Sequence, residues 1–207
     1  IDLSHISTIL EAGCGSGRLT IPVTGKIGQK SRIIGFDISS GPYQGALEVL
    51  KGNLQREKIG RIIEMVKGDV RDIAIRDEAV DLIISNELFC DLDRQGLEKT
   101  LKEFYRILKP KGKMAHAELT PVPENKAQQL FIESNSYSLE TLKPAPKWFS
   151  PTSDEIASIM HKIGYENIIV KYFETNLRLD FEVSVKQLRE WNVDTAFIEK
   201  NDKNLRE

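Results

Sequence analysis

The sequence has little net charge and few residues of the kinds that form cross-links or metal sites. Its 29 Lys and Arg residues nearly balance 31 Asp and Glu residues, so the formal net charge is −2. It therefore lacks the strongly basic balance that is typical of proteins bound to nucleic acid or to anionic membranes, and we expect neither partner. Two cysteines, Cys14 and Cys90, and three histidines form no disulfide framework and no spacing typical of zinc sites. We expect no metal and a reducing, cytoplasmic location.

Long apolar runs and internal repeats are missing as well. No run approaches the roughly 20 residues of a membrane-spanning helix, and the first residues lack the features of a signal peptide. The first predicted strand starts shortly after Ile1, so we expect the full protein to begin earlier. A chain of 207 residues that is 40% hydrophobic can bury one substantial core, which predicts a single domain over residues 1–207.

The most informative stretch is a glycine-rich loop after an apolar run. Residues 9–19 read Ile-Leu-Glu-Ala-Gly-Cys-Gly-Ser-Gly-Arg-Leu, with three alternate glycines after Glu11. Glycine adopts left-handed angles and lets a ligand approach the main chain, so this spacing predicts a tight cradle at a strand end. A helix that begins at Ser16 or Gly17 would point its free N–H groups at the same spot.

Apolar periodicity predicts strands that alternate with helices along most of the chain. The predicted strands are 6–12, 30–38, 62–67, 80–85, 112–119 and 167–174. The predicted helices are 18–27, 42–58, 94–109, 124–134 and one that starts within 150–155 and ends at Gly164, and the C-terminal segment 182–205 is helical in pattern. This order implies parallel pairing with right-handed crossovers, so the fold class is α/β: a doubly wound, mostly parallel sheet with helices on both faces.

Polar residues gather where the predicted strands end. Ligands of doubly wound sheets bind outside the carboxyl ends of the strands. At these ends stand Glu11 with the glycines, Asp37, Asp69, Asn86 with Glu87, and Glu118. Basic residues, including the run 109–113, precede strands and fall on the opposite edge, where we expect solvated side chains. Residues 120–150 carry four prolines and predict a lid or substrate-binding insertion at the functional edge.

Two ligand classes compete for such a glycine loop. Dinucleotides need the pattern G-x-G-x-x-G, in which the third glycine lets helix and strand close around a pyrophosphate. Here Arg18 occupies the place of that third glycine, which argues against a nicotinamide cofactor.

Several segments of the chain resemble the class I S-adenosylmethionine-dependent methyltransferases. Residues 11–17 are similar to the glycine-rich first motif of that family, and residues 36–39 to the acid that ends its second strand. The ends of its third and fourth strands and the turn before its fifth resemble residues 67–70, 79–86 and 108–113. The likeness covers about residues 5–175.

The resemblance implies S-adenosylmethionine as the methyl donor and S-adenosylhomocysteine as the product. The residues that it places at this cofactor are Glu11, Gly13, Cys14, Gly15, Gly17, Asp37, Ile38, Asp69, Val70 and Asn86. In this interpretation Glu11 lies near the amino group, Asp37 accepts both ribose hydroxyls and Asp69 takes the adenine amine. The Val70 amide meets a ring nitrogen, and Asn86 faces the methionine portion and the acceptor.

The acceptor is less defined. Family members that methylate amino groups of nucleic acids carry an Asn- or Asp-Pro-Pro-aromatic signature after the fourth strand, where this chain has Asn-Glu-Leu-Phe over 86–89. A small-molecule acceptor is therefore favoured, and the acidic edge favours a neutral or cationic one. A general base is needed only if the acceptor must lose a proton, and no single residue stands out as one. The candidates on the acceptor side are Glu87, Phe89, Asp91, Glu118 and Trp148.

Other interpretations stay open. His116 lies in the middle of a predicted strand, where a buried, hydrogen-bonded core histidine is favoured over a base. Cys14 and Cys90 are expected to be packed thiols, Asp81 a structural acid, and Trp148 either a lining of the acceptor pocket or a contact of the insertion with the core. The alternative function is a non-catalytic binding subunit of the same fold, with segment 182–205 as its contact to a partner. The oligomeric state is not predicted.

Overall fold

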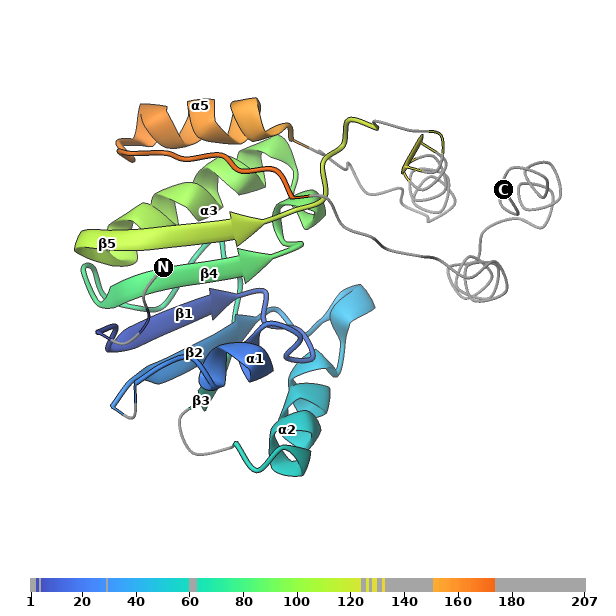
Figure 1. Ribbon diagram of the computed structural model, residues 1–207, viewed down its shortest axis with the longest axis vertical. Helices are drawn as coiled ribbons and strands as arrows, with labels where there is room; N and C mark the ends of the chain where they lie inside the picture. The colour runs from blue at the N-terminus through green and yellow to red at the C-terminus, as the bar shows by residue number, and fades with distance from the viewer. Residues whose placement is uncertain are drawn as a thin grey trace, which may run out of the picture.

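Five parallel strands form one sheet at the centre of the protein (Figure 1). The computed structural model describes residues 3, 5–28, 30–59, 63–123 and 151–173, together with 126, 128, 129 and 132. The strands are β1 (Thr8–Ala12), β2 (Arg32–Asp37), β3 (Ile63–Lys67), β4 (Val80–Asn86) and β5 (Leu108–Ala117). Their order is β3-β2-β1-β4-β5, and every ladder is parallel. The chain moves outward from β1 to β3 and then crosses back to β4, so the direction of winding reverses between β1 and β4.

Helices cover both faces of the sheet because successive strand residues point to opposite sides. The helices are α1 (Thr20–Thr24), α2 (Ala46–Arg56), α3 (Arg94–Ile107) and α5 (Ser153–Ile163), with single 3₁₀ turns at η1 (Gly41–Tyr43) and η2 (Phe89–Asp91). Leu10 and Ile83 pack with α3 and α5 on one face, while Ile9 and Leu82 pack with α2 on the other. The predicted doubly wound α/β fold is therefore confirmed.

The two long helices of the first face have well-defined ends. Asp93 caps α3 by accepting a hydrogen bond from the Gly96 amide at 2.6 Å. Thr152 and Glu155 form a reciprocal capping box at the start of α5, and Gly164 ends this helix in the left-handed conformation, with φ 117°. None of the described helices has the length and apolar character needed to cross a membrane.

Some predicted boundaries are wrong. The helix predicted over 18–27 is a single turn, and the one predicted over 42–58 begins at Ala46, after η1. The strand predicted at 112–119 starts at Leu108, with an irregular register against β4 near Val80.

The predicted strand at 167–174 does not form over residues 167–173. Asn167 has φ 55°, and Ile169, Tyr172 and Phe173 are 76%, 73% and 81% exposed. A strand needs a hydrogen-bonded neighbour, and within the part of the chain that is described β5 pairs with β4 alone. The apolar pattern was therefore an insufficient signal. Of the helix predicted at 124–134, residues 126, 128, 129 and 132 are described and helical. Most of the 120–150 insertion, Trp148 and the segment 182–205 lie outside the described residues.

Arg106 of α3 ties the connection between β3 and β4 to the helix. Its guanidinium donates to the carbonyl oxygens of Ile73 and Ile75, each at 2.8 Å, and pairs with Asp77 and Glu103, each at 2.7 Å. One side chain therefore holds residues 73–77 of this connection against α3.

Candidate functional site

The glycine-rich loop lies between β1 and α1, at the carboxyl edge of the sheet. Gly13, Gly15 and Gly17 have φ values of 71°, 49° and 93°, in the region that favours glycine. A Cβ at Gly17 would lie 2.5 Å from Leu50 Cδ1, whereas a Cβ at Gly15 would have no heavy atom within 4 Å. The loop is thus closed against α2 at Gly17 and open to a ligand at Gly15. Cys14 is 3% exposed, as expected for a packed thiol.

The end of β2 holds this loop in place. The Asp37 carboxylate accepts a hydrogen bond from the Gly15 amide at 2.9 Å and one from the Ser39 amide at 2.7 Å. Asp37 is 6% exposed, while the neighbouring Ile38 is 40% exposed and offers an apolar surface beside it. Each carboxylate oxygen of Asp37 retains a second lone pair for a further donor.

Glu11 is a buried acid beneath the loop. It is 2% exposed, and its Oε2 atom has no hydrogen-bond partner among the described residues. Burial, with a smaller contribution from the charge of Asp37, raises the pKa of Glu11 to about 7. A buried acceptor without a donor is costly, so this oxygen is suited to an incoming cationic group.

Asp69 has a partner that the sequence analysis missed. Both of its oxygens accept hydrogen bonds from the Arg71 guanidinium, at 2.5 to 3.0 Å, and Oδ1 also accepts from the Arg71 amide at 2.9 Å. This interaction lowers the pKa of the Asp69 carboxyl group. Val70 is 7% exposed and packs into the hydrophobic core. The sequence feature that could have predicted this contact is the arginine, Arg71, two residues after Asp69.

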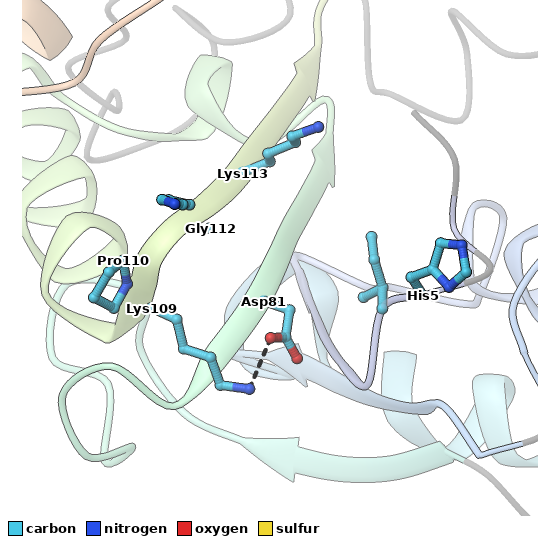
Figure 2. A pocket seen from close by; sticks show the side chains of 8 residues that line it. His5, Asp81, Lys109, Pro110, Gly112 and Lys113 are labelled. Carbon is cyan, nitrogen blue, oxygen red and sulfur yellow. Dashed lines mark hydrogen bonds and ion pairs between the residues drawn. The ribbon is translucent and has the colours of Figure 1, made fainter.

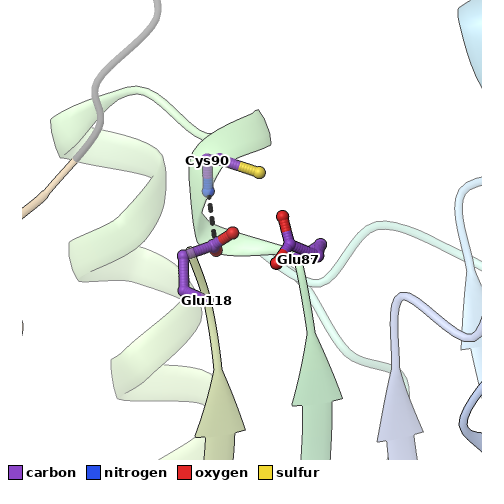
Figure 3. A group of neighbouring side chains, drawn as sticks. All are labelled: Glu87, Cys90 and Glu118. Carbon is purple, nitrogen blue, oxygen red and sulfur yellow. Dashed lines mark hydrogen bonds between the residues drawn. The ribbon is translucent and has the colours of Figure 1, made fainter. Parts of the chain in front are cut away.

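A second group of polar side chains lies beyond the ends of β4 and β5 (Figure 3). One carboxylate oxygen each of Glu87 and Glu118 and the Cys90 sulfur lie within 4.8 Å of one another. Glu118 Oε2 accepts hydrogen bonds from the backbone amides of Phe89 at 3.0 Å and Cys90 at 3.2 Å. These three donors are close enough to approach one metal ion. Glu118 is thus anchored by η2, whereas Glu87 is exposed at the end of β4.

His116 supports Glu118 from inside the sheet. Its Nδ1 atom is 2.8 Å from Ser85 Oγ, and its Nε2 atom is 3.3 Å from Glu118 Oε2. The ring stacks on Phe89, with centroids 3.7 Å apart, and Phe89 is fully buried. His116 is therefore a hydrogen-bonded residue within the sheet, as the sequence favours, although it is only partly buried. Phe89, predicted on the acceptor side, lies in the core behind it and has no surface for an acceptor.

Tyr43 of η1 is a further residue that the sequence analysis missed. It lies near the Asp91 carboxylate of η2, and partial desolvation raises the pKa of both groups. The segment that follows β2 therefore comes close to the segment that follows β4.

The carboxyl edge is therefore divided into two halves. The glycine loop, Glu11 and Asp37 occupy the β1–β2 half, and Glu87 with Glu118 occupies the β4–β5 half. The two halves meet where Leu88 lies 3.1 Å from an ideal Cβ position at Gly13, with Asn86 exposed at the end of β4. This meeting point lies at the reversal of strand order, where doubly wound sheets bind their ligands.

A separate cavity of about 380 Å³ lies at the opposite edge of the sheet (Figure 2). It is lined by His5, Ile6, Asp81 and residues 109–113. Asp81 accepts a hydrogen bond from the Thr8 amide at 2.8 Å and pairs with Lys109 at 2.7 Å, so it is structural, as predicted. None of the predicted site residues lines this cavity.

Fold and site together define a class of α/β proteins with a glycine-rich loop at the reversal of strand order in a parallel sheet. Residues 9–112 match the family model described as a methyltransferase domain. The chain belongs to this family, within the class I S-adenosylmethionine-dependent methyltransferases.

Comparisons with individual proteins agree. The YcgJ protein of Bacillus subtilis superimposes with a TM-score of 0.72 at 14% identity, over 96% of this chain and 76% of that one. A putative methyltransferase of Bacillus halodurans, BH2331, gives 0.71 at 17% identity, over 96% and 77%. These two likenesses show the fold.

Two curated relatives have assigned substrates. The demethylmenaquinone methyltransferase of Lactobacillus johnsonii is 32% identical over 126 residues, 60% of this chain and 48% of its own length. The malonyl-[acyl-carrier protein] O-methyltransferase of Priestia megaterium is 32% identical over 148 residues, 65% of this chain and 50% of its own. The chain thus spans about half the length of the curated relatives it matches.

Proposed function

We propose that this chain binds S-adenosylmethionine on the β1–β2 half of the carboxyl edge and transfers its methyl group to a small-molecule acceptor on the β4–β5 half. The observation that carries the proposal is the Glu11 carboxyl group, which is buried below the open glycine loop with one oxygen lacking a donor. The amino group of S-adenosylmethionine is a cation of the kind that this oxygen needs.

The other residues of the loop fit the same ligand. Gly15 leaves open space where a side chain would project, so the ligand can approach the main chain closely. Asp37 retains acceptor capacity for the two ribose hydroxyls, and Ile38 presents apolar surface next to it. Asp69 would bind the adenine amine while it keeps part of its contact with Arg71. Gly13, Cys14, Gly17, Val70 and Asn86 complete the proposed cofactor site.

When bound, S-adenosylmethionine supplies a methyl group on a positively charged sulfur, which is already activated for in-line displacement. The chain itself mainly has to align the acceptor with that methyl group, a contribution that reaches roughly 7–11 kcal/mol in ideal cases. The meeting point of the two halves, near Asn86 and Leu88, is where we place this alignment.

Two observations support a small molecule as the acceptor. The formal net charge of −2 provides no general attraction for nucleic acid, and the acceptor half carries acids. The curated relatives named above act on a quinone precursor and on a malonyl thioester.

Isothermal titration with S-adenosylhomocysteine and S-adenosylmethionine tests the proposal. Saturable binding that is weakened at least tenfold by Glu11→Gln supports it, with Glu57→Gln on the exposed end of α2 as the control. Absence of binding by folded protein at millimolar ligand contradicts it. Binding without methyl transfer to any acceptor would instead favour a non-catalytic binding subunit.

A further inference from the structure

Glu87 combines several features that the binding of S-adenosylmethionine does not explain. It directly follows β4, and its φ of 51° is unusual for a residue with a side chain. Such a conformation is strained, and strained backbone concentrates at functional sites. The Glu87 amide donates to the carbonyl oxygen of Ala117 at 2.9 Å, which fixes its backbone against the end of β5.

Two further acids act on Glu87. One carboxylate oxygen of Glu118 and the Cys90 sulfur lie within 4.8 Å of a Glu87 carboxylate oxygen, and the charge of Asp91 in η2 also acts on it. His116 stands behind Glu118, 3.3 Å from it, and does not reach Glu87 within the distance that groups the other three. Two neighbouring carboxylates cannot both ionise freely, so such a pair holds one proton between them.

The two carboxyl groups differ in what holds them. Glu118 has two backbone amides and His116 as partners, which favour its charged form and lower its pKa. Burial, and then the charge of Glu118, raises the pKa of Glu87 to about 7. The proton of the pair therefore resides on Glu87, which is the exposed member and the one that a ligand can reach.

From this geometry we propose that Glu87 is the catalytic base of this chain, that Glu118 is its positioning residue, and that the acceptor is a neutral molecule which loses a proton on methylation, such as a hydroxylated aromatic ring or an enol. The inference deepens the proposed function and rests on it. In the form of the pair that has lost its proton, which grows in population as pH rises through about 7, Glu87 accepts the proton of the acceptor while the new bond to the methyl carbon forms. The electron pair of the broken carbon–sulfur bond stays on sulfur, and the proton ends on Glu87, hydrogen-bonded to the Glu118 carboxylate.

This assignment restricts the acceptor class. A carboxylate acceptor needs no base, and three acids at this edge of the sheet would repel it. The two relatives named above are a demethylmenaquinone methyltransferase and a malonyl-[acyl-carrier protein] O-methyltransferase. For this chain the proposal favours a ring that loses a proton over a malonyl carboxylate.

A carbon-13 titration of the protein, with glutamate labelled at the side-chain carboxyl, tests the pair without any acceptor. We expect two resonances that titrate near pH 7, one from Glu11 and one from Glu87. The resonance that remains in Glu11→Gln should disappear in Glu87→Gln and move to lower pH in Glu118→Gln. The exposed-surface variant Glu57→Gln should leave it in place. Titration of both Glu87 and Glu118 below pH 5 overturns the proposal. The rival interpretation is a metal site formed by Glu87, Cys90 and Glu118. The titration is therefore repeated with ZnCl₂. Tight zinc binding that is lost in Cys90→Ser would show a metal site and overturn the assignment.

The catalytic role is tested with radiolabelled S-adenosylmethionine and a panel of a catechol, a 1,4-naphthohydroquinone, a 1,3-diketone and malonyl pantetheine. We expect transfer to at least one of the first three, a rate that rises with pH through about 7, and a loss of 10²-fold or more in Glu87→Gln. The affinity of Glu87→Gln for S-adenosylhomocysteine should stay within about twofold of the wild type. Retained cofactor binding would show that the loss of activity reflects the missing base and not a wrong assignment of the cofactor site. The inference is overturned by transfer to malonyl pantetheine alone, by no transfer within the panel despite cofactor binding, or by full activity of Glu87→Gln.

Discussion

The Asp37 carboxylate accepts a hydrogen bond from the Gly15 amide at 2.9 Å, across 22 residues of sequence. The acid proposed to bind the ribose is therefore also the residue that holds the glycine loop in its open shape. Loss of this acid should affect the fold and the ligand together.

Replacing Asp37 by Ala should lower both stability and cofactor affinity. The Gly15 and Ser39 amides would lose their acceptor, which costs about 1–3 kcal/mol of unfolding free energy. We expect affinity for S-adenosylhomocysteine to fall at least tenfold, measured by titration calorimetry beside urea denaturation. Asp72→Ala, on the exposed connection after β3, is the control. Unchanged affinity would remove Asp37 from the ribose role.

Replacing Gly17 by Ala should destabilise the protein by about 2 kcal/mol or more. The new Cβ would meet the fully buried Leu50 at 2.5 Å, and the φ of 93° is strained for any residue with a side chain. The matched change Gly52→Ala, on the exposed side of α2 with nothing within 4 Å, should instead stabilise by about 0.5–1 kcal/mol. Urea denaturation of both variants checks this, and equal effects would contradict the closed fit of the loop at Gly17.

The folded protein should become less stable as pH rises because of Glu11. Its pKa of about 7 in the folded state exceeds the ordinary value of 4.5, so between these pH values the folded form binds a proton that the unfolded form has lost. This costs on the order of 3 kcal/mol above pH 7. Glu11→Gln should match the wild type near pH 4 and exceed its unfolding free energy increasingly up to about pH 7.

The same variant should bind S-adenosylmethionine less tightly, since the amide offers no charge to the ligand's ammonium group. Glu11→Gln would then unfold less readily but bind S-adenosylmethionine less tightly. This combination is expected for a residue that serves ligand binding at the expense of stability. A stability difference that is independent of pH would show that Glu11 ionises normally.

Replacing Thr152 by Ala should lower the unfolding free energy by about 1 kcal/mol without changing cofactor affinity. The Thr152 hydroxyl accepts from the Glu155 amide at 3.2 Å, and the variant leaves that donor at the start of α5 unpaired. Thermal denaturation and calorimetric titration measure the two effects. A change in affinity would mean that α5 is coupled to the glycine loop.

Much of the fold could be predicted because its signals are local. The apolar runs before Glu11, Asp37 and Asn86 end where the strands end, and the parallel sheet follows from their alternation with helices. The segment 167–173 shows the limit of this reasoning. Apolar residues such as Ile169 and Phe173 describe what a strand would bury, but pairing depends on a neighbour that local sequence does not reveal.

The site was predictable in its positions and less so in its contacts. The sequence brought Glu87 and Glu118 to the same edge, but it did not show that Glu118 turns inward to two backbone amides while Glu87 stays exposed. Likewise, the Tyr43 contact with Asp91 and the Arg71 contact with Asp69 depend on side-chain directions. These directions are set by the turns η1 and η2 and by the connection after β3, whose shapes are not periodic.

Arg106 has a consequence for the cooperativity of the fold. Since its guanidinium donates to two carbonyl oxygens of the connection that precedes β4, detaching that connection from α3 breaks both hydrogen bonds and the ion pair with Asp77. We expect residues 73–77 and the last turns of α3 to open as one unit, with amide hydrogens that exchange at a common rate. Asp69 lies in the same connection. The contacts of Arg106 on α3 therefore also limit the movement of the adenine side of the proposed site.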